Sequence, residues 1–116
     1  MNTLSQMHCA AYRSDEPPMA KNEIEQFKPQ IPEWVLEEQT GIQRLERAFT
    51  FKNFAQALRF TNQVGTLAEA EGHHPTILLE WGRVTITWWT HNVQGLHLND
   101  FIMAAKTDGV YTYQAR

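Results

Sequence analysis

The spacing of the hydrophobic side chains changes twice along this sequence, and these changes limit the folds open to it. Over residues 42–51 apolar residues alternate with polar ones, which is typical of a β-strand with one buried face. Over residues 54–68 they recur at steps of three and four, the spacing of an amphipathic helix, and Gly72 is suited to end that helix. Alternation then returns over residues 76–90, with Gly82 near its middle, and predicts a β-hairpin.

Weaker signals near both ends complete the order of elements. Asn22 is suited to cap a short helix over residues 23–28, and a strand is expected over 34–38. Asn99 or Asp100 is suited to begin a last helix. The resulting order, α-β-β-α-β-β-α, predicts an α+β fold in which a four-stranded antiparallel sheet carries three helices on one face.

The same patterns predict where the large side chains lie. Thr85, Thr87 and Trp89 share the face that an antiparallel sheet can leave open, and Trp89 there is a candidate for ligand stacking or subunit contact. The other large apolar side chains singled out by the patterns are expected in the core: Trp34, Phe54, Leu58, Trp81 and Trp88.

Length and charge exclude several kinds of protein. A chain of 116 residues is suited to one domain, which we expect over residues 21–116 after an N-terminal arm over 1–20. A net charge of −3 argues against nucleic acid or an anionic membrane as the main partner. The sequence contains no run long enough to span a bilayer and no signal-peptide pattern, so we expect a cytoplasmic protein. Cys9, the only cysteine, is expected to be a free thiol in a loose arm.

The predicted hairpin brings three histidines to one end of the sheet. If the turn is centred on Gly82, His73 lies opposite His91 and His74 lies opposite Thr90. Adjacent residues in extended backbone point apart. One of His73 and His74 is therefore expected inside a pocket and the other at its rim.

Facing histidines are suited to a reaction that needs both an acid and a base, because imidazole exchanges protons near neutral pH. A dehydration is such a reaction, since one group protonates the leaving hydroxyl while another removes a proton from the neighbouring atom. Glu69 and Asp100 are placed to orient the imidazoles. A three-histidine zinc site is the alternative, but neighbours that point apart are poorly placed to share one metal, so the sequence favours no metal.

The spacing of these residues resembles the signature of the pterin-4a-carbinolamine dehydratases, in particular the bacterial members. The resemblance covers roughly residues 22–105 and rests on several fixed intervals, which makes it more specific than a His-His-Pro triplet alone. Its positions are Glu69, His73, His74, Pro75, Trp81, His91 and Asp100.

The resemblance implies an activity, the removal of water from 4a-hydroxytetrahydrobiopterin to give quinonoid dihydropterin, with no cofactor. Of the catalytic histidines, His73 and His91 resemble the acid/base pair, and His74 resembles a residue that binds and orients the substrate. Glu69 and Asp100 resemble supporting carboxylates. The implied substrate contacts are Glu69, His73, His74, Pro75, Thr90, His91, Asn92, Val93 and Asp100.

The resemblance also implies partners. Relatives form homodimers or homotetramers, and the pterin would be recycled for an aromatic amino acid hydroxylase. Two alternatives stay open at this point. One is a protein-binding regulator or transcriptional coactivator, and the other is a dehydratase-like protein of molybdopterin metabolism.

Overall fold

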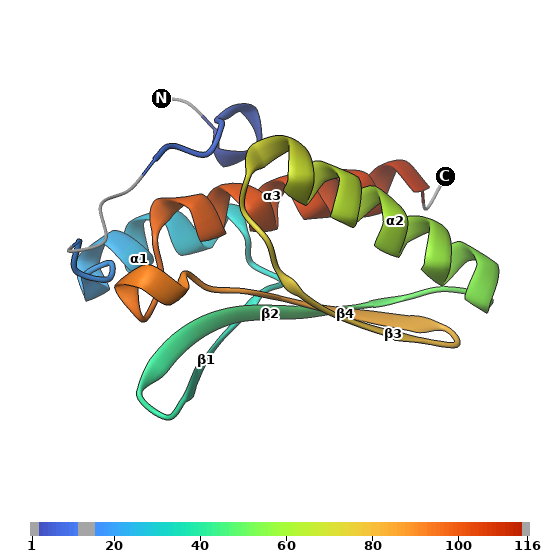
Figure 1. Ribbon diagram of the computed structural model, residues 1–116, viewed down its shortest axis with the longest axis horizontal. Helices are drawn as coiled ribbons and strands as arrows, with labels where there is room; N and C mark the ends of the chain where they lie inside the picture. Colours follow the sequence, from blue (N-terminus) through green and yellow to red (C-terminus); the bar gives the residue numbers. More distant parts are fainter. Residues whose placement is uncertain (1–2, 12–15, 115–116) are drawn as a thin grey trace.

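One antiparallel sheet of four strands forms the base of the fold, and three helices cover one of its faces (Figure 1). The structure is a computed structural model that describes residues 3–11 and 16–114. The predicted α-β-β-α-β-β-α order and the α+β class are confirmed. The helices and strands are α1 (Lys21–Phe27), β1 (Val35–Gln39), β2 (Ile42–Thr50), α2 (Phe54–Glu71), β3 (Thr76–Glu80), β4 (Arg83–Trp88) and α3 (Leu98–Gln114). Short 3₁₀ turns are η1 (Leu4–Gln6), η2 (Lys28–Gln30) and η3 (His91–Val93).

The strands lie in the order β1-β2-β4-β3, so β2 and β4 are central and β1 and β3 are the edges. In the hairpin, Thr76 pairs with Thr87, one residue away from the predicted partner, Trp88. The reason is the turn, which consists of Trp81 and Gly82 and is therefore centred between them rather than on Gly82. The ladder also ends at Thr76, so the histidines lie just beyond it instead of facing one another within it.

The core lies between the sheet and the helices. Val84, Ile86 and Trp88 of β4 point to the helices and have no exposed surface. Their alternate neighbours lie on the other face, where the Thr87 hydroxyl donates to the Glu46 carboxylate and the Arg44 guanidinium lies 4.4 Å from the centre of a Trp89 ring.

The phase of α2 differs from the prediction. Phe54 and Leu58, expected in the core, are 43% and 40% exposed, whereas Phe60 is fully buried. The inner stripe of this helix consists of Ala57, Phe60, Val64 and Ala68. Gly72 ends α2 as expected, in a left-handed conformation (φ 67°), and at the start of the helix the Asn53 side chain accepts the Gln56 N–H.

Trp81 is a second error in the predicted core, since it is 68% exposed. It occupies the β3–β4 turn, while Trp34 and Trp88 are buried as expected. α3 runs through Asp108 and Gly109 and continues to Gln114. Asp108 holds that stretch, because its carboxylate accepts hydrogen bonds from Trp34 Nε1 and Arg47.

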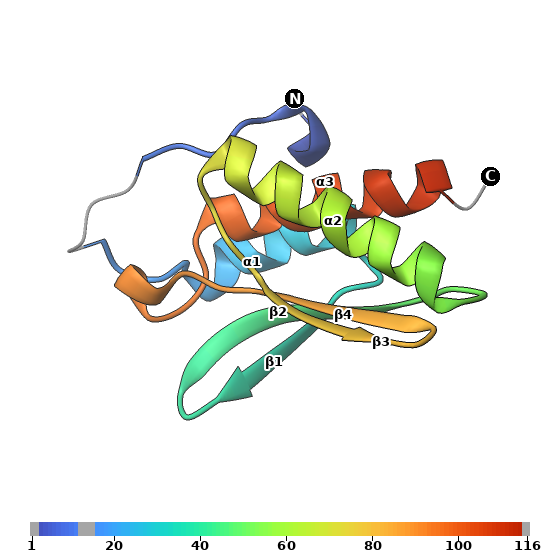
Figure 2. The same ribbon diagram turned by 45° about the vertical axis from the view of Figure 1, so that its right-hand side comes forward.

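The N-terminal residues are not a loose arm where the structure describes them. Leu4 is fully buried, and residues 4–11 follow the helix layer on the side away from the sheet (Figures 1 and 2). Cys9 is a free thiol as expected, but it is half-buried against α3, and burial raises its pKa to about 12. Its sulfur therefore stays a neutral thiol at working pH. Among the described residues, no helix has the length and apolar character that crossing a membrane requires.

The phase of α2 leads to a stability test. Phe60→Ala leaves a cavity in a closed core and is expected to lower the free energy of unfolding by about 3–5 kcal/mol. Phe54→Ala, the control on the same helix, is expected to cost less than about 1 kcal/mol because much of that ring is already in water. Urea unfolding followed by circular dichroism measures both. Equal losses would contradict the assignment of the inner face.

Candidate active site

A cavity of about 370 Å³ lies at the end of the sheet where β3 begins and β4 has ended. The loop after α2 forms one wall, and the chain leading into η3 forms the other. The two walls bring together residues nearly twenty positions apart in the sequence. The lining residues are Gly72, His73, His74, Pro75, Thr76, Trp89, Thr90, His91 and Asn92.

His73 is the buried imidazole of this cavity. Its Nε2 lies 2.6 Å from Oδ1 of Asp100, a carboxylate with no exposed surface, and its ring stacks on Trp88 at 5.7 Å between ring centres. The second oxygen of Asp100 accepts hydrogen bonds from the Thr90 hydroxyl (2.7 Å) and the His97 main-chain N–H (2.9 Å). The ring orientation of His73 is therefore fixed, and Nδ1 is the nitrogen that Asp100 does not use.

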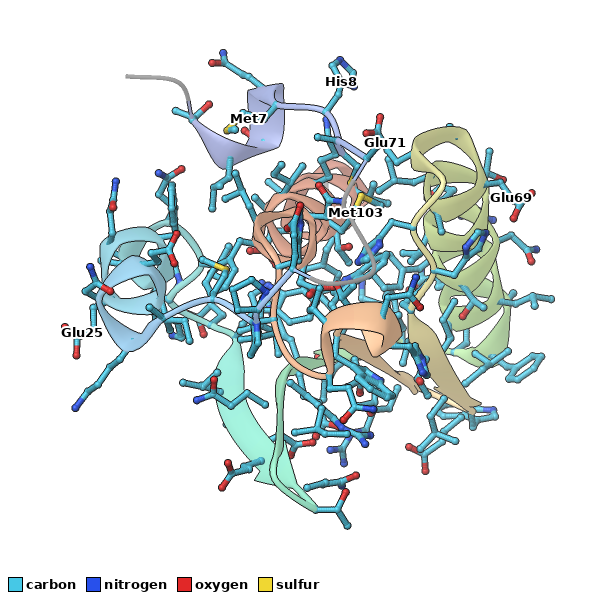
Figure 3. All side chains as sticks on the ribbon, turned by 60° about the vertical axis from the view of Figure 1, so that its left-hand side comes forward. Met7, His8, Glu25, Glu69, Glu71 and Met103 are labelled. Atoms are coloured by element: carbon cyan, nitrogen blue, oxygen red, sulfur yellow. The ribbon has the colours of Figure 1, made fainter. Side chains whose placement is uncertain are left out.

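His74 has the opposite surroundings. It is exposed, and its Nε2 pairs with the carboxylate of Glu69, which is exposed as well. Figure 3 shows Glu69 on the outer side of α2, away from the side of the helix that bears Glu71. The expectation that adjacent histidines face different environments therefore agrees with the structure, in which His73 is 6% exposed and His74 lies at the rim.

His91 belongs to the second wall. It begins η3 and is exposed, and its ring centre lies 3.7 Å from that of Trp89. Arg44 covers the same tryptophan. The indole of Trp89 is therefore occupied by neighbours of its own chain, and its contact with His91 limits where that imidazole can turn.

The structure brings most of the predicted site residues together. Six of the nine line the cavity: His73, His74, Pro75, Thr90, His91 and Asn92. Asp100 and Glu69 contact the histidines but do not line the cavity. Val93, the last residue of η3, is buried and does not line the cavity.

Sequence reasoning missed His97. Its main-chain N–H donates to Asp100, and its ring Nδ1 accepts the N–H of Asn99 at the start of α3. The side chain thus satisfies a donor that the first turn of the helix leaves unpaired. Its position just before Asn99-Asp100 is the sequence signal for such a cap.

The Nε2 atoms of the two adjacent histidines contact different carboxylates, Asp100 for His73 and Glu69 for His74. Within residues 3–11 and 16–114, no three side chains of the His, Cys, Asp or Glu type are placed to hold one metal ion. The arrangement is instead suited to holding and moving protons, because each wall presents an imidazole to the same cavity.

Residues 17–110 match the sequence model of the family Pterin 4 alpha carbinolamine dehydratase. The chain belongs to this family. A transcriptional coactivator/pterin dehydratase from Brucella melitensis has a similar structure, with a TM-score of 0.72 and 28% identity over 81% of this chain and 98% of that one. A pterin dehydratase-like protein, identified as a RuBisCO assembly factor in the alpha-carboxysome, has a TM-score of 0.56 and 26% identity over 66% of this chain and 89% of that one.

The two histidine–carboxylate pairs of this pterin dehydratase family member differ in burial, and they should therefore differ in how much they contribute to the free energy of unfolding. Asp100→Asn loses the charge that three donors share, so we expect unfolding to become easier by about 1–3 kcal/mol. Glu69→Gln, the control, should stay within about 0.5 kcal/mol because exposed ion pairs contribute little. Guanidinium unfolding measures both, and a larger loss in the Glu69 variant would reverse this ranking.

Proposed function

We propose that this protein catalyses the dehydration of a 4a-hydroxytetrahydropterin by histidine acid/base catalysis. The observation that carries the proposal is the position of His73 and His91 on different walls of one cavity, with Asp100 buried behind His73. Membership of the pterin dehydratase family supports the substrate class. The physiological reaction would be the recycling of tetrahydrobiopterin for an aromatic amino acid hydroxylase.

The reaction needs one proton delivered and one removed. The C–O bond at the hydroxyl-bearing carbon breaks, and the hydroxyl takes a proton to leave as water. The adjacent ring nitrogen loses its proton, and its electron pair forms the new carbon–nitrogen double bond. Nothing is oxidised or reduced overall. Two imidazoles are suited to this exchange when one enters the cycle protonated and the other neutral.

The surroundings of the histidines support different roles. Asp100 is placed to stabilise a positive charge on His73 and to hold its ring, so that Nδ1 serves the substrate. His91 serves as the second proton-transfer group from the opposite wall. His74, exposed at the rim and held by Glu69, binds and orients the flat pterin together with Pro75.

Two other functions are the alternatives to the dehydratase. One relative is a coactivator as well as a dehydratase, and another is a RuBisCO assembly factor, so the fold also serves protein binding. A protein-binding role or a related reaction in molybdopterin metabolism would not require both walls to present an imidazole to a pterin carbinolamine. The three-histidine cavity therefore favours the dehydratase.

The activity is testable in a coupled assay in which phenylalanine hydroxylase generates the 4a-hydroxytetrahydropterin. The wild-type protein should accelerate its decay, and His73→Ala and His91→Ala should each lower kcat by about 10²-fold or more, because each removes a proton-transfer group. Glu80→Ala, at the far end of the hairpin, is the control and should keep wild-type activity.

Two outcomes of this assay would contradict the proposal. An inactive wild-type protein would remove the dehydratase function itself. Full activity in the His73→Ala, His91→Ala double variant would retain the function but remove the proposed mechanism. Stoichiometric zinc in the purified protein, with activity lost to a chelator, would restore the metal alternative.

The division of labour between the two histidines is a separate prediction. The pH dependence of kcat/KM reports the essential acid and base of the free enzyme. In the variant that lacks the base, the fall in rate at low pH should disappear, while the variant that lacks the acid should lose the fall at high pH. Profiles of equal shape in the two single variants would show that the histidines do not divide the roles.

A further inference from the structure

The described N-terminal segment, residues 4–11, lies before the range that matches the family, yet it packs on the elements that carry the candidate site. Leu4 is fully buried, its main-chain N–H donates to Gln30 Oε1, and Lys106 of α3 donates to the main-chain oxygen of Ser5. These contacts hold the start of the segment. Its other end contacts the end of α2, which leads to His73, and the start of α3, which carries Asp100.

The first place is the end of α2. Glu71, two residues before His73, accepts the Cys9 main-chain N–H at 2.8 Å with one carboxylate oxygen. Its other oxygen lies 2.9 Å from Nδ1 of His8 (Figure 3). These partners favour the charged form, the Cys9 N–H first and the His8 ring second, and so lower the pKa of the Glu71 carboxyl below its usual value.

The second place is the start of α3. Asn99, the residue before Asp100, is only 2% exposed. Its side-chain oxygen accepts the Ala10 N–H at 2.9 Å, and its side-chain nitrogen donates to the Ala10 oxygen at 2.8 Å. One amide side chain thus pairs with both main-chain groups of a single residue in the N-terminal segment.

We propose that residues 4–11 act as a clamp on the His73–Asp100 pair, with Glu71 and Asn99 as the positioning residues through which the clamp acts. His73 comes from the chain after α2 and Asp100 from the first turn of α3, so the length of their 2.6 Å contact depends on how these two helix ends sit. Consecutive residues of the clamp bind both ends. Neither Glu71 nor Asn99 lines the cavity, so the clamp acts on the geometry of His73 and not on substrate contact.

The catalytic consequence rests on the proposed dehydratase function. Glu71→Ala removes both bonds to the clamp and should lower kcat about tenfold, with KM changed by less than about twofold, since second-layer partners of a catalytic group act in this range without touching substrate. Glu71→Gln keeps an acceptor for the Cys9 N–H and should restore most of the rate. His8→Ala changes a well-exposed side chain and is expected to leave the fold intact. It should also lower kcat, but by less than Glu71→Ala does.

Glu25→Ala is the matched control, because it removes an exposed carboxylate from α1, a helix that carries neither His73 nor Asp100 (Figure 3). A second readout, independent of turnover, is the proton NMR signal of the His73 ring N–H, which the short bond to Asp100 places downfield. Glu71→Ala should shift or broaden that signal, and Glu25→Ala should leave it in place.

The outcomes separate the two proposals. An inactive wild-type protein whose His73 signal still responds to Glu71→Ala would keep the clamp and remove the dehydratase. An active wild-type protein in which Glu71→Ala and Glu25→Ala both match the wild type in kcat and in the His73 signal would remove the clamp. A change in KM alone would also overturn it, since the clamp predicts an effect on kcat.

Discussion

The bond between His73 and Asp100 joins the end of α2 to the start of α3, and much of the structure around the site follows from it. A carboxylate without exposed surface is costly unless donors surround it. Asp100 obtains them from three stretches of chain: the His73 ring, the Thr90 hydroxyl and the His97 main chain. The hydrogen bonds that stabilise this buried carboxylate are the same ones that bring both walls of the cavity together. Stability and site geometry therefore share one set of contacts.

The bond to Asp100 gives the two adjacent histidines different surroundings. Because neighbouring residues in extended backbone point apart, only one of them enters the interior. His73 stacks on Trp88 and meets a buried acid, while His74 stays at the surface with an exposed one. One sequence motif thus yields an imidazole in a fixed orientation beside one that can follow a ligand. This difference explains how a His-His pair supports two roles instead of duplicating one.

The sequence was sufficient for the element order, the end of α2 at Gly72 and the meeting of three histidines, because each follows from local spacing or from residues with special backbone preferences. It was insufficient where the sequence is compatible with two helix faces or two hairpin registers. Phe54 and Leu58 offer α2 an apolar face as plausible as that of Phe60, and only packing against the sheet decides. The hairpin register depended on whether the turn is centred on Gly82 or between Trp81 and Gly82. Glu71 and Asn99 bind main-chain atoms of the N-terminal segment, and such partners leave no mark in side-chain spacing.

Family membership accounts for the sheet, the helices and the cavity, but some of the contacts that hold the site come from outside the matched range. The matched range begins at residue 17, and a solved relative is covered almost completely by about four-fifths of this chain. Residues 4–11 nevertheless use their main-chain groups on the two helix ends that deliver His73 and Asp100. A fold shared by dehydratases and assembly factors needs this precision only where protons must be transferred, since a binding surface tolerates small shifts that a proton-transfer distance does not. The bracing of a buried histidine–carboxylate pair from outside the matched range is therefore an argument for catalysis that is independent of the histidine signature.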